Sequence, residues 1–152
     1  MADCIFCKIA RNEVPSMKVY EDDFSLAFLD INPSMPGHTL VIPKAHAESI
    51  FDIDEKSLEH LSVAVKKIAD KIHSDLRADV SILQNNGRGA EQGVPHLHFH
   101  VVPRMHGDGL KMHPLPRKMA EEQMKEMQRR LKIETGAPTR RADAEHGWEN
   151  EF

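Results

Sequence analysis

The sequence lacks long apolar segments, and this absence argues against an integral membrane protein. A helix that spans a bilayer needs about 18 or more consecutive apolar residues, and the 152 residues contain no such run. The first residues show no basic segment followed by an apolar core, so we expect no secretory signal peptide. We predict that the protein has no membrane partner.

Cysteine is also scarce, because the chain holds only Cys4 and Cys7, three residues apart. So close a pair suits a metal site or a redox pair better than a structural disulfide. Two unligated thiols are a further alternative. The lack of disulfide candidates predicts a reducing compartment, and we expect a cytoplasmic protein.

No charge of one sign dominates. The net charge of -4 argues against general nucleic-acid binding, which normally needs a strongly basic face, but a few local donors can still bind a small anion. The hydrophobic content of 40% and charged content of 29% are typical of a globular domain. The length fits one domain. We place it over residues 1–135, followed by a polar tail over 136–152 without any pattern.

Apolar residues at helical spacing predict a short helix within residues 1–13, a long helix over 54–76 and a C-terminal helix over 117–133. Five runs have the composition of strands: Lys18–Tyr20, Ser25–Ile31, His38–Ile42, Val80–Leu83 and His96–Val102. Because most of the strands follow one another, the order favours an α+β fold, with an antiparallel sheet and helices packed against it.

The last of these strands carries three alternating histidines, His96, His98 and His100. Side chains two apart on a strand share a face, and three imidazoles are costly to bury without partners. Neutral imidazole can attack phosphorus or bind a metal, and imidazolium can stabilise a phosphate. A metal site on this strand stays open, although same-face positions about 6.6 Å apart would strain to give one ion three ligands.

A loop with three glycines, over residues 85–93, comes directly before the histidines. Glycine lets the backbone approach a ligand closely and point its N–H groups inward. A plain hairpin loop would have a similar sequence. Because the loop over residues 85–93 comes directly before the histidines, we expect a phosphate bound by its amides to lie over them.

With these residues the sequence resembles the histidine-triad (HIT) family of nucleotide hydrolases and transferases. The family signature is three histidines alternating with apolar residues and followed by two more apolar residues, which His96–Val102 matches throughout. The following Pro103-Arg104 is similar to the branch that includes dinucleoside-polyphosphate hydrolases and many bacterial members. The resemblance extends over roughly residues 4 to 104 and implies a HIT-like fold.

The resemblance implies a role for each matched residue. His98 would attack the α-phosphorus of a nucleotide and form a nucleotidyl-histidine intermediate, while His100 would hydrogen-bond the phosphate or assist the leaving group. Asn85, Gln92 and the amide of Gly93 would contact the phosphate, and Asp30 would accept from the ribose hydroxyls. An apolar slot for a base, expected to be a purine, would consist of Ile5, Phe6, Ile9, Phe28 and Ile31, for which the alternative is ordinary core.

Members of the family with a Cys-x-x-Cys start are similar to uridylyltransferase relatives that hold zinc with two cysteines and two histidines. Mapped onto this chain, the ligands would be Cys4, Cys7, His46 and His96. Four protein ligands imply a structural zinc ion, which leaves His98 and His100 for chemistry. His38, a further recurrent family histidine, would either contact the active-site histidines and orient them, or have a structural role.

Two residues depart from the family pattern. Glu91 stands where glycine is common, and we expect it to face outward because a carboxylate would repel phosphate. Gly93 stands where serine or threonine is frequent, so a phosphate-contacting hydroxyl is absent. The resemblance implies a homodimer, paired through the long helix and a sheet edge, that hydrolyses a purine nucleoside phosphoramidate or a dinucleoside polyphosphate. Two alternatives are a nucleotidyltransferase to a phosphate acceptor and a nucleotide-binding regulatory protein with little turnover.

Overall fold

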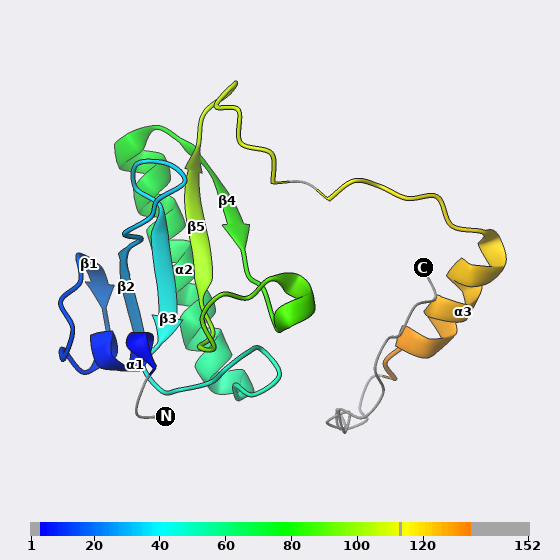
Figure 1. The fold of residues 1–152 in the computed structure, drawn as a ribbon, viewed down its shortest axis with the longest axis horizontal. Helices are drawn as coiled ribbons and strands as arrows, with labels where there is room; N and C mark the ends of the chain where they lie inside the picture. The colour runs from blue at the N-terminus through cyan, green and yellow to red at the C-terminus, as the bar shows by residue number, and fades with distance from the viewer. Residues whose placement is uncertain (1–3, 113, 135–152) are drawn as a thin grey trace. The chain divides into compact units, whose positions relative to one another are not determined.

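The computed structural model describes residues 4–112 and 114–134 (Figure 1). The chain divides into two compact units, Met1–Asp108 and Gly109–Phe152. The elements in chain order are α1 (Ile5–Ala10), β1 (Lys18–Glu21), β2 (Ser25–Leu29), β3 (Thr39–Pro43), α2 (Glu55–Leu76), β4 (Asp79–Leu83), the 3-10 turn η1 (Arg88–Ala90), β5 (Phe99–Arg104) and α3 (Glu121–Leu131). The expected polar tail over 136–152 lies outside the described residues, and the domain limit at residue 135 stays a prediction.

The strands of the first unit form one five-stranded sheet in the order β1-β2-β3-β5-β4. All four neighbouring pairs are antiparallel, which confirms the predicted α+β class. β5 lies between β3 and β4, and His100 pairs with Leu40 on one side and Leu83 on the other. The sheet therefore holds the end of the histidine motif from both sides.

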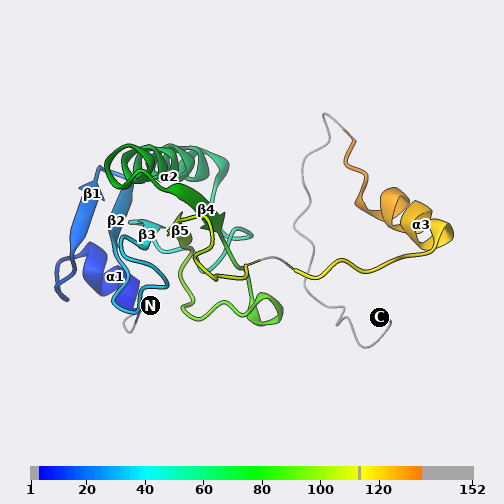
Figure 2. The same ribbon diagram turned by 90° about the horizontal axis from the view of Figure 1, so that it is seen from above.

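The long helix α2 covers one face of the sheet (Figure 2). Asp54 caps its start, where the carboxylate accepts a hydrogen bond from the Ser57 N–H at 2.9 Å. Arg77, in the left-handed region with φ of 52°, ends it. The buried stripe between consists of Leu61, Ala64, Val65, Ile68 and Ile72. This stripe packs on Val41 and Val101 of the sheet, and each large side chain buried there contributes about 1.5–3 kcal/mol.

The short helix α1 lies on the opposite face of the sheet (Figure 2). A helix of six residues is not stable by itself, so its packing holds it in place. The apolar cluster beneath it consists of Phe6, Ile9, Leu26, Phe28, Leu40 and Ile42. Because Cys4 caps α1 and Cys7 lies within it, this packing also fixes the two sulfur atoms relative to the sheet.

The prediction of a continuous strand over His96–Val102 is wrong in its first half, since β5 begins at Phe99. His96 lies in a bend, and the N–H of Leu97 donates to the carbonyl of Ala47 at 2.7 Å. This bond ties the start of the motif to the loop after β3 instead of to β3 itself. Propensity and alternation in the sequence contain no information about that long-range partner.

Two other expected strand ends also differ. β5 continues through Pro103, because at that point it pairs with β4 alone and a missing N–H breaks no bond to β3. β2 ends at Leu29, two residues before the expected end, and leaves Asp30 and Ile31 in the following turn.

In the second unit, α3 is shorter than the helix expected over 117–133. Its expected apolar face is exposed, with Met124 at 56% and Leu131 at 74% exposure, and none of its described residues is buried. None of the described helices combines the length and apolar composition that crossing a bilayer requires.

Candidate active site and metal centre

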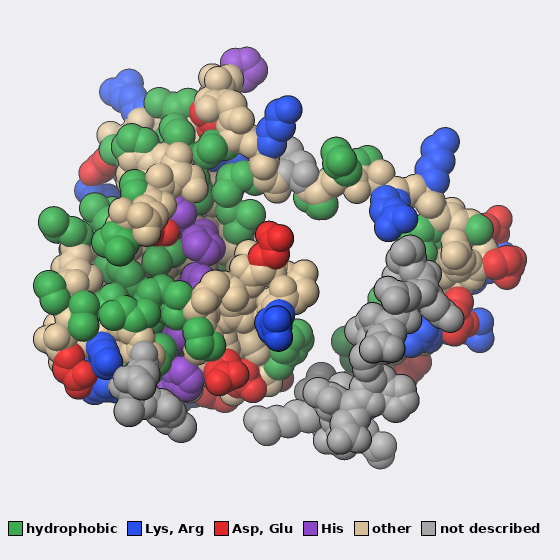
Figure 3. Space-filling view, viewed as in Figure 1, with side chains coloured by type: hydrophobic (Ala, Val, Ile, Leu, Met, Phe, Trp, Pro, Cys, Tyr) green, Lys and Arg blue, Asp and Glu red, His purple; other side chains and the backbone are tan. Residues whose placement is uncertain are grey.

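The histidine side chains gather in a hollow of the first unit (Figure 3). His98 is only 6% exposed, and its ring makes a T-shaped contact with that of Phe6 at a centroid distance of 5.3 Å. Its Nδ1 lies 2.6 Å from the carbonyl oxygen of His96. A carbonyl oxygen only accepts, so Nδ1 carries the hydrogen and Nε2 carries the lone pair. The backbone thereby selects the tautomer whose Nε2 can act as a nucleophile.

His100 is given the opposite arrangement by a chain of hydrogen bonds. The backbone N–H of Ser34 donates to Nδ1 of His38 at 3.1 Å, so the hydrogen of the neutral His38 ring is on Nε2. That Nε2 lies 2.9 Å from Nδ1 of His100 and donates to it. His100 therefore carries its own hydrogen on Nε2, where it can donate to an anionic ligand.

Burial keeps both of these rings neutral. Burial, together with the neighbouring rings of His98 and His38, lowers the pKa of His100 to about 4. Burial also lowers the pKa of His38, and the Asp30 carboxylate partly offsets this effect. Oδ2 of Asp30 lies 3.6 Å from Nε2 of His38. At neutral pH His100 is thus a neutral hydrogen-bond donor.

A second cluster, which we call the metal centre, joins Cys4, Cys7, His46 and His96, and their donor atoms all lie within 4.8 Å of one another. Nδ1 of His96 is 3.4 Å from Sγ of Cys4, 3.5 Å from Sγ of Cys7 and 3.3 Å from Nδ1 of His46. Sγ of Cys7 is 3.2 Å from Nδ1 of His46. A tetrahedral zinc ion, with bonds of about 2.3 Å to sulfur and 2.05 Å to nitrogen, needs S···N edges of about 3.5 Å and N···N edges of about 3.3 Å. The residues fit such an ion closely.

The chemistry of the donors also fits a cation. Nε2 of His96 lies 2.9 Å from the carbonyl oxygen of Pro43, so it carries the hydrogen and leaves the Nδ1 lone pair toward the metal centre. Burial raises the pKa of the Cys7 thiol, and its hydrogen bond and charge interaction with Cys4 raise it further. A divalent cation would offset these causes and favour the thiolate.

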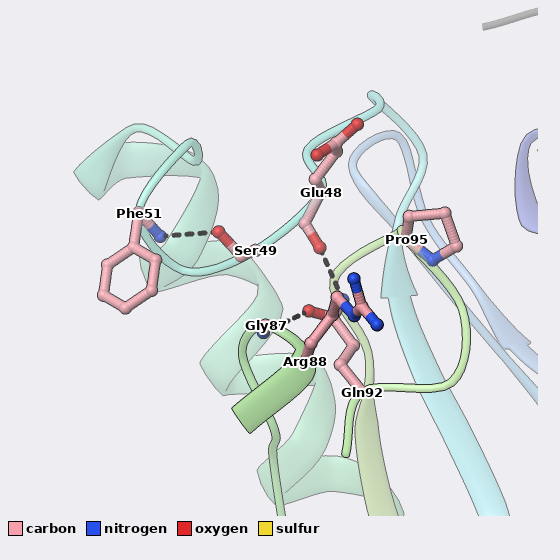
Figure 4. Close-up of a pocket in the computed structure, with 7 residues that line it drawn as sticks. All are labelled: Glu48, Ser49, Phe51, Gly87, Arg88, Gln92 and Pro95. Carbon is pink, nitrogen blue, oxygen red and sulfur yellow. Dashed lines mark hydrogen bonds between the residues drawn. The ribbon is translucent and has the colours of Figure 1, made fainter. Parts of the chain in front are cut away.

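The loop over residues 87–93 is held by the side chain of Gln92. Its Oε1 accepts from the Gly87 N–H at 2.8 Å, and its Nε2 donates to the carbonyls of Glu48 at 2.6 Å and Val94 at 2.9 Å (Figure 4). These bonds close the loop and fasten it to the segment after β3, across a surface pocket that Arg88 also lines. The structure therefore gives the Gln92 side chain a bracing function, whereas the sequence predicts a phosphate contact.

The remaining phosphate-loop residues have room for a ligand. Glu91 is exposed and adopts a left-handed conformation with φ of 58°. Gly93 is exposed, and a Cβ atom added to it would have no neighbour within 4 Å. A side chain at position 93 would thus fit without rearrangement.

The five residues of the expected base slot fall into two groups. Phe6, Ile9 and Phe28 are buried together under α1, whereas Ile5 is 41% and Ile31 is 90% exposed. The buried three are also core residues, as the alternative stated. The two exposed residues offer apolar surface that a planar base can cover.

Sequence reasoning missed Gln84 and Asn86, which flank Asn85. Their side-chain amides hydrogen-bond each other, with Nε2 of Gln84 donating to Oδ1 of Asn86 at 2.9 Å and Nδ2 of Asn86 donating in return. The only sequence signal is a pair of amide residues two apart at the end of a strand, which is too common to identify a function.

Comparison with known proteins gives a consistent result. Residues 11–107 match the family described as the HIT domain. The chain is 45% identical over 101 residues to an adenosine 5′-monophosphoramidase of Schizosaccharomyces pombe, covering 66% of this chain and 74% of that protein. It resembles the crystal structure of a HIT-family member from Bacillus subtilis, with 39% identity, a TM-score of 0.78 and coverage of 84% and 94%. It also resembles a zinc-bound histidine triad family protein from Mycobacterium smegmatis, with 38% identity, a TM-score of 0.70 and coverage of 76% and 85%.

Proposed function

The chain belongs to the HIT-domain family, and from this membership and the geometry of His98 we propose that it hydrolyses a nucleotide conjugate by attack on the α-phosphate. The observation that carries the proposal is the hydrogen bond from Nδ1 of His98 to the His96 carbonyl at 2.6 Å. It fixes an unprotonated Nε2 on a buried ring without needing a charged partner. A nucleophile with a free electron pair at neutral pH is what covalent phosphorus chemistry requires.

In the proposed first step, the Nε2 electron pair of His98 forms a bond to phosphorus while the bond from phosphorus to the leaving group breaks. For a phosphoramidate, the amine departs with that electron pair and takes a proton from solvent. The attached imidazole becomes positively charged, and its Nδ1–H remains hydrogen-bonded to the His96 carbonyl, which stabilises the charge. Water then attacks phosphorus and loses a proton to solvent while the bond from phosphorus to Nε2 breaks, which releases the nucleoside monophosphate and returns the electron pair to Nε2 of His98.

His100 serves the phosphate oxygens in this scheme. Its Nε2–H, set by His38, donates to a non-bridging oxygen on which negative charge increases in the transition state. A pKa of about 4 makes it a poor proton donor to the leaving group at pH 7, so hydrogen bonding is the better of its two implied roles. His38 acts through His100 and fixes its tautomer.

The substrate class that we propose first is a purine nucleoside phosphoramidate, and a dinucleoside polyphosphate comes second. The 45% identity to an adenosine 5′-monophosphoramidase supports this order. Asp30, in the turn directly after β2, would accept from the ribose hydroxyls, and the exposed Ile5 and Ile31 would cover the base. Asn85 and the Gly93 amide would contact the phosphate.

The metal proposed for Cys4, Cys7, His46 and His96 is zinc. The donor distances fit it, and a relative of 38% identity is zinc-bound. When bound, the ion would join α1, the loop after β3 and the start of the histidine motif, and all four of its positions would be filled by protein. It would have a structural role, with no open position for substrate.

We also propose a homodimer paired through α2 and the edge strand β4. β4 has a free sheet edge, and apolar side chains remain exposed there, with Ile82 at 49% on β4 and Val63 at 54% on α2. Sedimentation should give a dimer for the protein and a monomer for Ile82→Lys. The control is Val19→Lys, on the opposite edge strand and equally exposed at 49%, which should leave the dimer intact.

A binding protein with little turnover remains the second candidate, favoured by two observations on the loop. The Gln92 side chain is occupied by backbone partners, and Gly93 has no hydroxyl. Both remove donors that would stabilise a transition state.

The test is incubation with an adenosine phosphoramidate, following release of AMP. The protein should release AMP at a rate that His98→Ala lowers by about 10³-fold or more, whereas His106→Ala, in an exposed turn, should match the unaltered protein. AMP binding without release would support the binding protein instead. Release only on addition of a phosphorylated acceptor would support the transferase.

A further inference from the structure

Gln84 and Asn86 form a closed pair of amides around Asn85. Besides the two bonds between them, Nε2 of Gln84 donates to the carbonyl of Asn85 at 3.1 Å. Oδ1 of Asn86 accepts a further bond from the Ile50 N–H at 2.7 Å. The three residues are half-buried, so water competes weakly for these groups. The pair therefore constrains the backbone on both sides of Asn85.

The register of the sheet shows which way this constraint directs Asn85. β4 ends with Leu83 paired to His100. The paired residues of the two strands end there. Gln84 and Asn86 share a side, because their side chains bond each other, and alternation then puts Asn85 on the same side as Leu83. Paired residues of an antiparallel ladder share a face, so Asn85 falls on the face that carries His100.

Gln84 and Asn86 lie on the other face, because side chains alternate along an extended chain. Their mutual hydrogen bonds require that they share a side, in agreement with this alternation. Val80, also an even-numbered residue of β4 and its continuation, packs on the cluster under α2. The side chains of Gln84 and Asn86 thus constrain Asn85 from the opposite face of the chain, which does not carry the site.

We propose that Gln84 and Asn86 are positioning residues that fix the carboxamide of Asn85 toward the α-phosphate. The inference rests on the proposed function, because it takes Asn85 as a phosphate contact. Neither residue touches the substrate. Asn86 also couples Asn85 to the loop after β3 through Ile50, so the carboxamide is fixed against the same segment that Gln92 fastens to the phosphate loop.

Neutral amides suit this arrangement better than carboxylates or apolar groups. Each amide has a donor and an acceptor, so two of them can bond reciprocally without charge. Asn86→Asp keeps the acceptor for Ile50 and Gln84 and loses one donor. Asn86→Leu keeps the branched shape of the side chain and loses every hydrogen bond that it makes. The two variants separate hydrogen bonding from packing.

The test is a double-mutant cycle of Asn85→Ala and Asn86→Leu. AMP affinity, measured by calorimetry, and kcat and KM with an adenosine phosphoramidate are the readouts. We expect Asn85→Ala to lower kcat/KM by about 10²- to 10³-fold, as loss of one transition-state donor does, and Asn86→Leu to cause most of the same loss. The double variant should be no worse than Asn85→Ala alone, and Asn86→Asp, which keeps two of the three bonds, should be more active than Asn86→Leu.

Gln128→Leu, an exposed amide of α3, serves as the matched control and should match the unaltered protein. Losses that multiply in the double variant would overturn the proposal, since Asn86 would then act independently of Asn85. Asn86→Leu with unchanged AMP affinity and unchanged kcat/KM would overturn the proposal as well. If the protein binds AMP without turnover, the proposed function fails while the same cycle, read in AMP affinity, still decides on the amide pair. If AMP does not bind, both fail.

Discussion

The metal centre and the catalytic hollow use the same side chain in opposite ways, although His96 and His98 are only two residues apart. In His96 a backbone carbonyl accepts from Nε2 and leaves Nδ1 as a donor to metal. In His98 a backbone carbonyl accepts from Nδ1 and leaves the electron pair on Nε2, the proposed nucleophile. The two histidines thus differ in which ring nitrogen bonds to a backbone carbonyl. This difference suits His96 to the proposed structural role and His98 to the proposed chemical role.

The two regions also differ in what keeps their histidine donor atoms unprotonated. A metal ion needs its ligands unprotonated, and the catalytic hollow needs His98 with a free electron pair. The metal centre would obtain this condition from the cation. In the hollow, the backbone carbonyl of His96 holds the hydrogen of the neutral ring on Nδ1 and leaves the electron pair on Nε2. Changes at one region should therefore affect mainly stability, and changes at the other mainly turnover.

The largest effect should come from removing the metal centre. Cys7→Ser should abolish stoichiometric zinc and lower the free energy of unfolding by more than about 4 kcal/mol, as loss of a structural metal does. Turnover per folded molecule should fall by less than about tenfold, the low end for loss of a supporting group. Zinc analysis, urea unfolding and AMP release check these values. Equal zinc content in Cys7→Ser and the unaltered protein would contradict the four-ligand site.

A smaller effect should appear when the pH is lowered. The unfolded chain protonates His100 near pH 6.5, whereas the folded protein does so only near its pKa of about 4. The contribution of neutral His100 to the free energy of unfolding is therefore complete above pH 6.5 and is lost as the pH falls toward 4. His38, whose pKa is also lowered, adds to the same trend. His100→Gln should reduce the slope of unfolding free energy against pH in this window, and an unchanged slope would contradict a neutral buried His100.

The smallest effect concerns the hydroxyl that the phosphate loop lacks. Gly93→Ser should raise kcat/KM for an adenosine phosphoramidate by about three- to tenfold, because it adds one hydrogen-bond donor where a Cβ meets no neighbour. Gly89→Ser is the matched control, since a Cβ there is equally free, and it should change nothing. A loss of activity in Gly93→Ser alone would show that position 93 does not face the phosphate.

Sequence reasoning located the local elements better than the long-range contacts. The stripe of α2 and the approximate positions of the five strands along the chain follow from the spacing of apolar residues, and the resemblance to the family was identified from His96–Val102. Alternation alone predicted three equivalent histidines on one strand. It could not show that Leu97 bonds to Ala47 and bends the chain, because that partner lies 50 residues away.

The candidate site was predicted unevenly for the same reason. The resemblance supplied the four residues that the structure assembles as the metal centre. The bracing function of Gln92 and the amide pair behind Asn85 depend on backbone atoms of Glu48 and Ile50, which no side-chain motif specifies. The base slot, the ribose contact of Asp30 and the cytoplasmic location stay predictions.

The most direct test is the position of the hydrogen on each imidazole of the motif, measured by long-range ¹H–¹⁵N correlation NMR near pH 7.5. The account predicts His98 protonated at Nδ1, and His96 and His100 protonated at Nε2. A His98 ring with its hydrogen on Nε2 would contradict the account, because that ring would have no electron pair to direct at phosphorus.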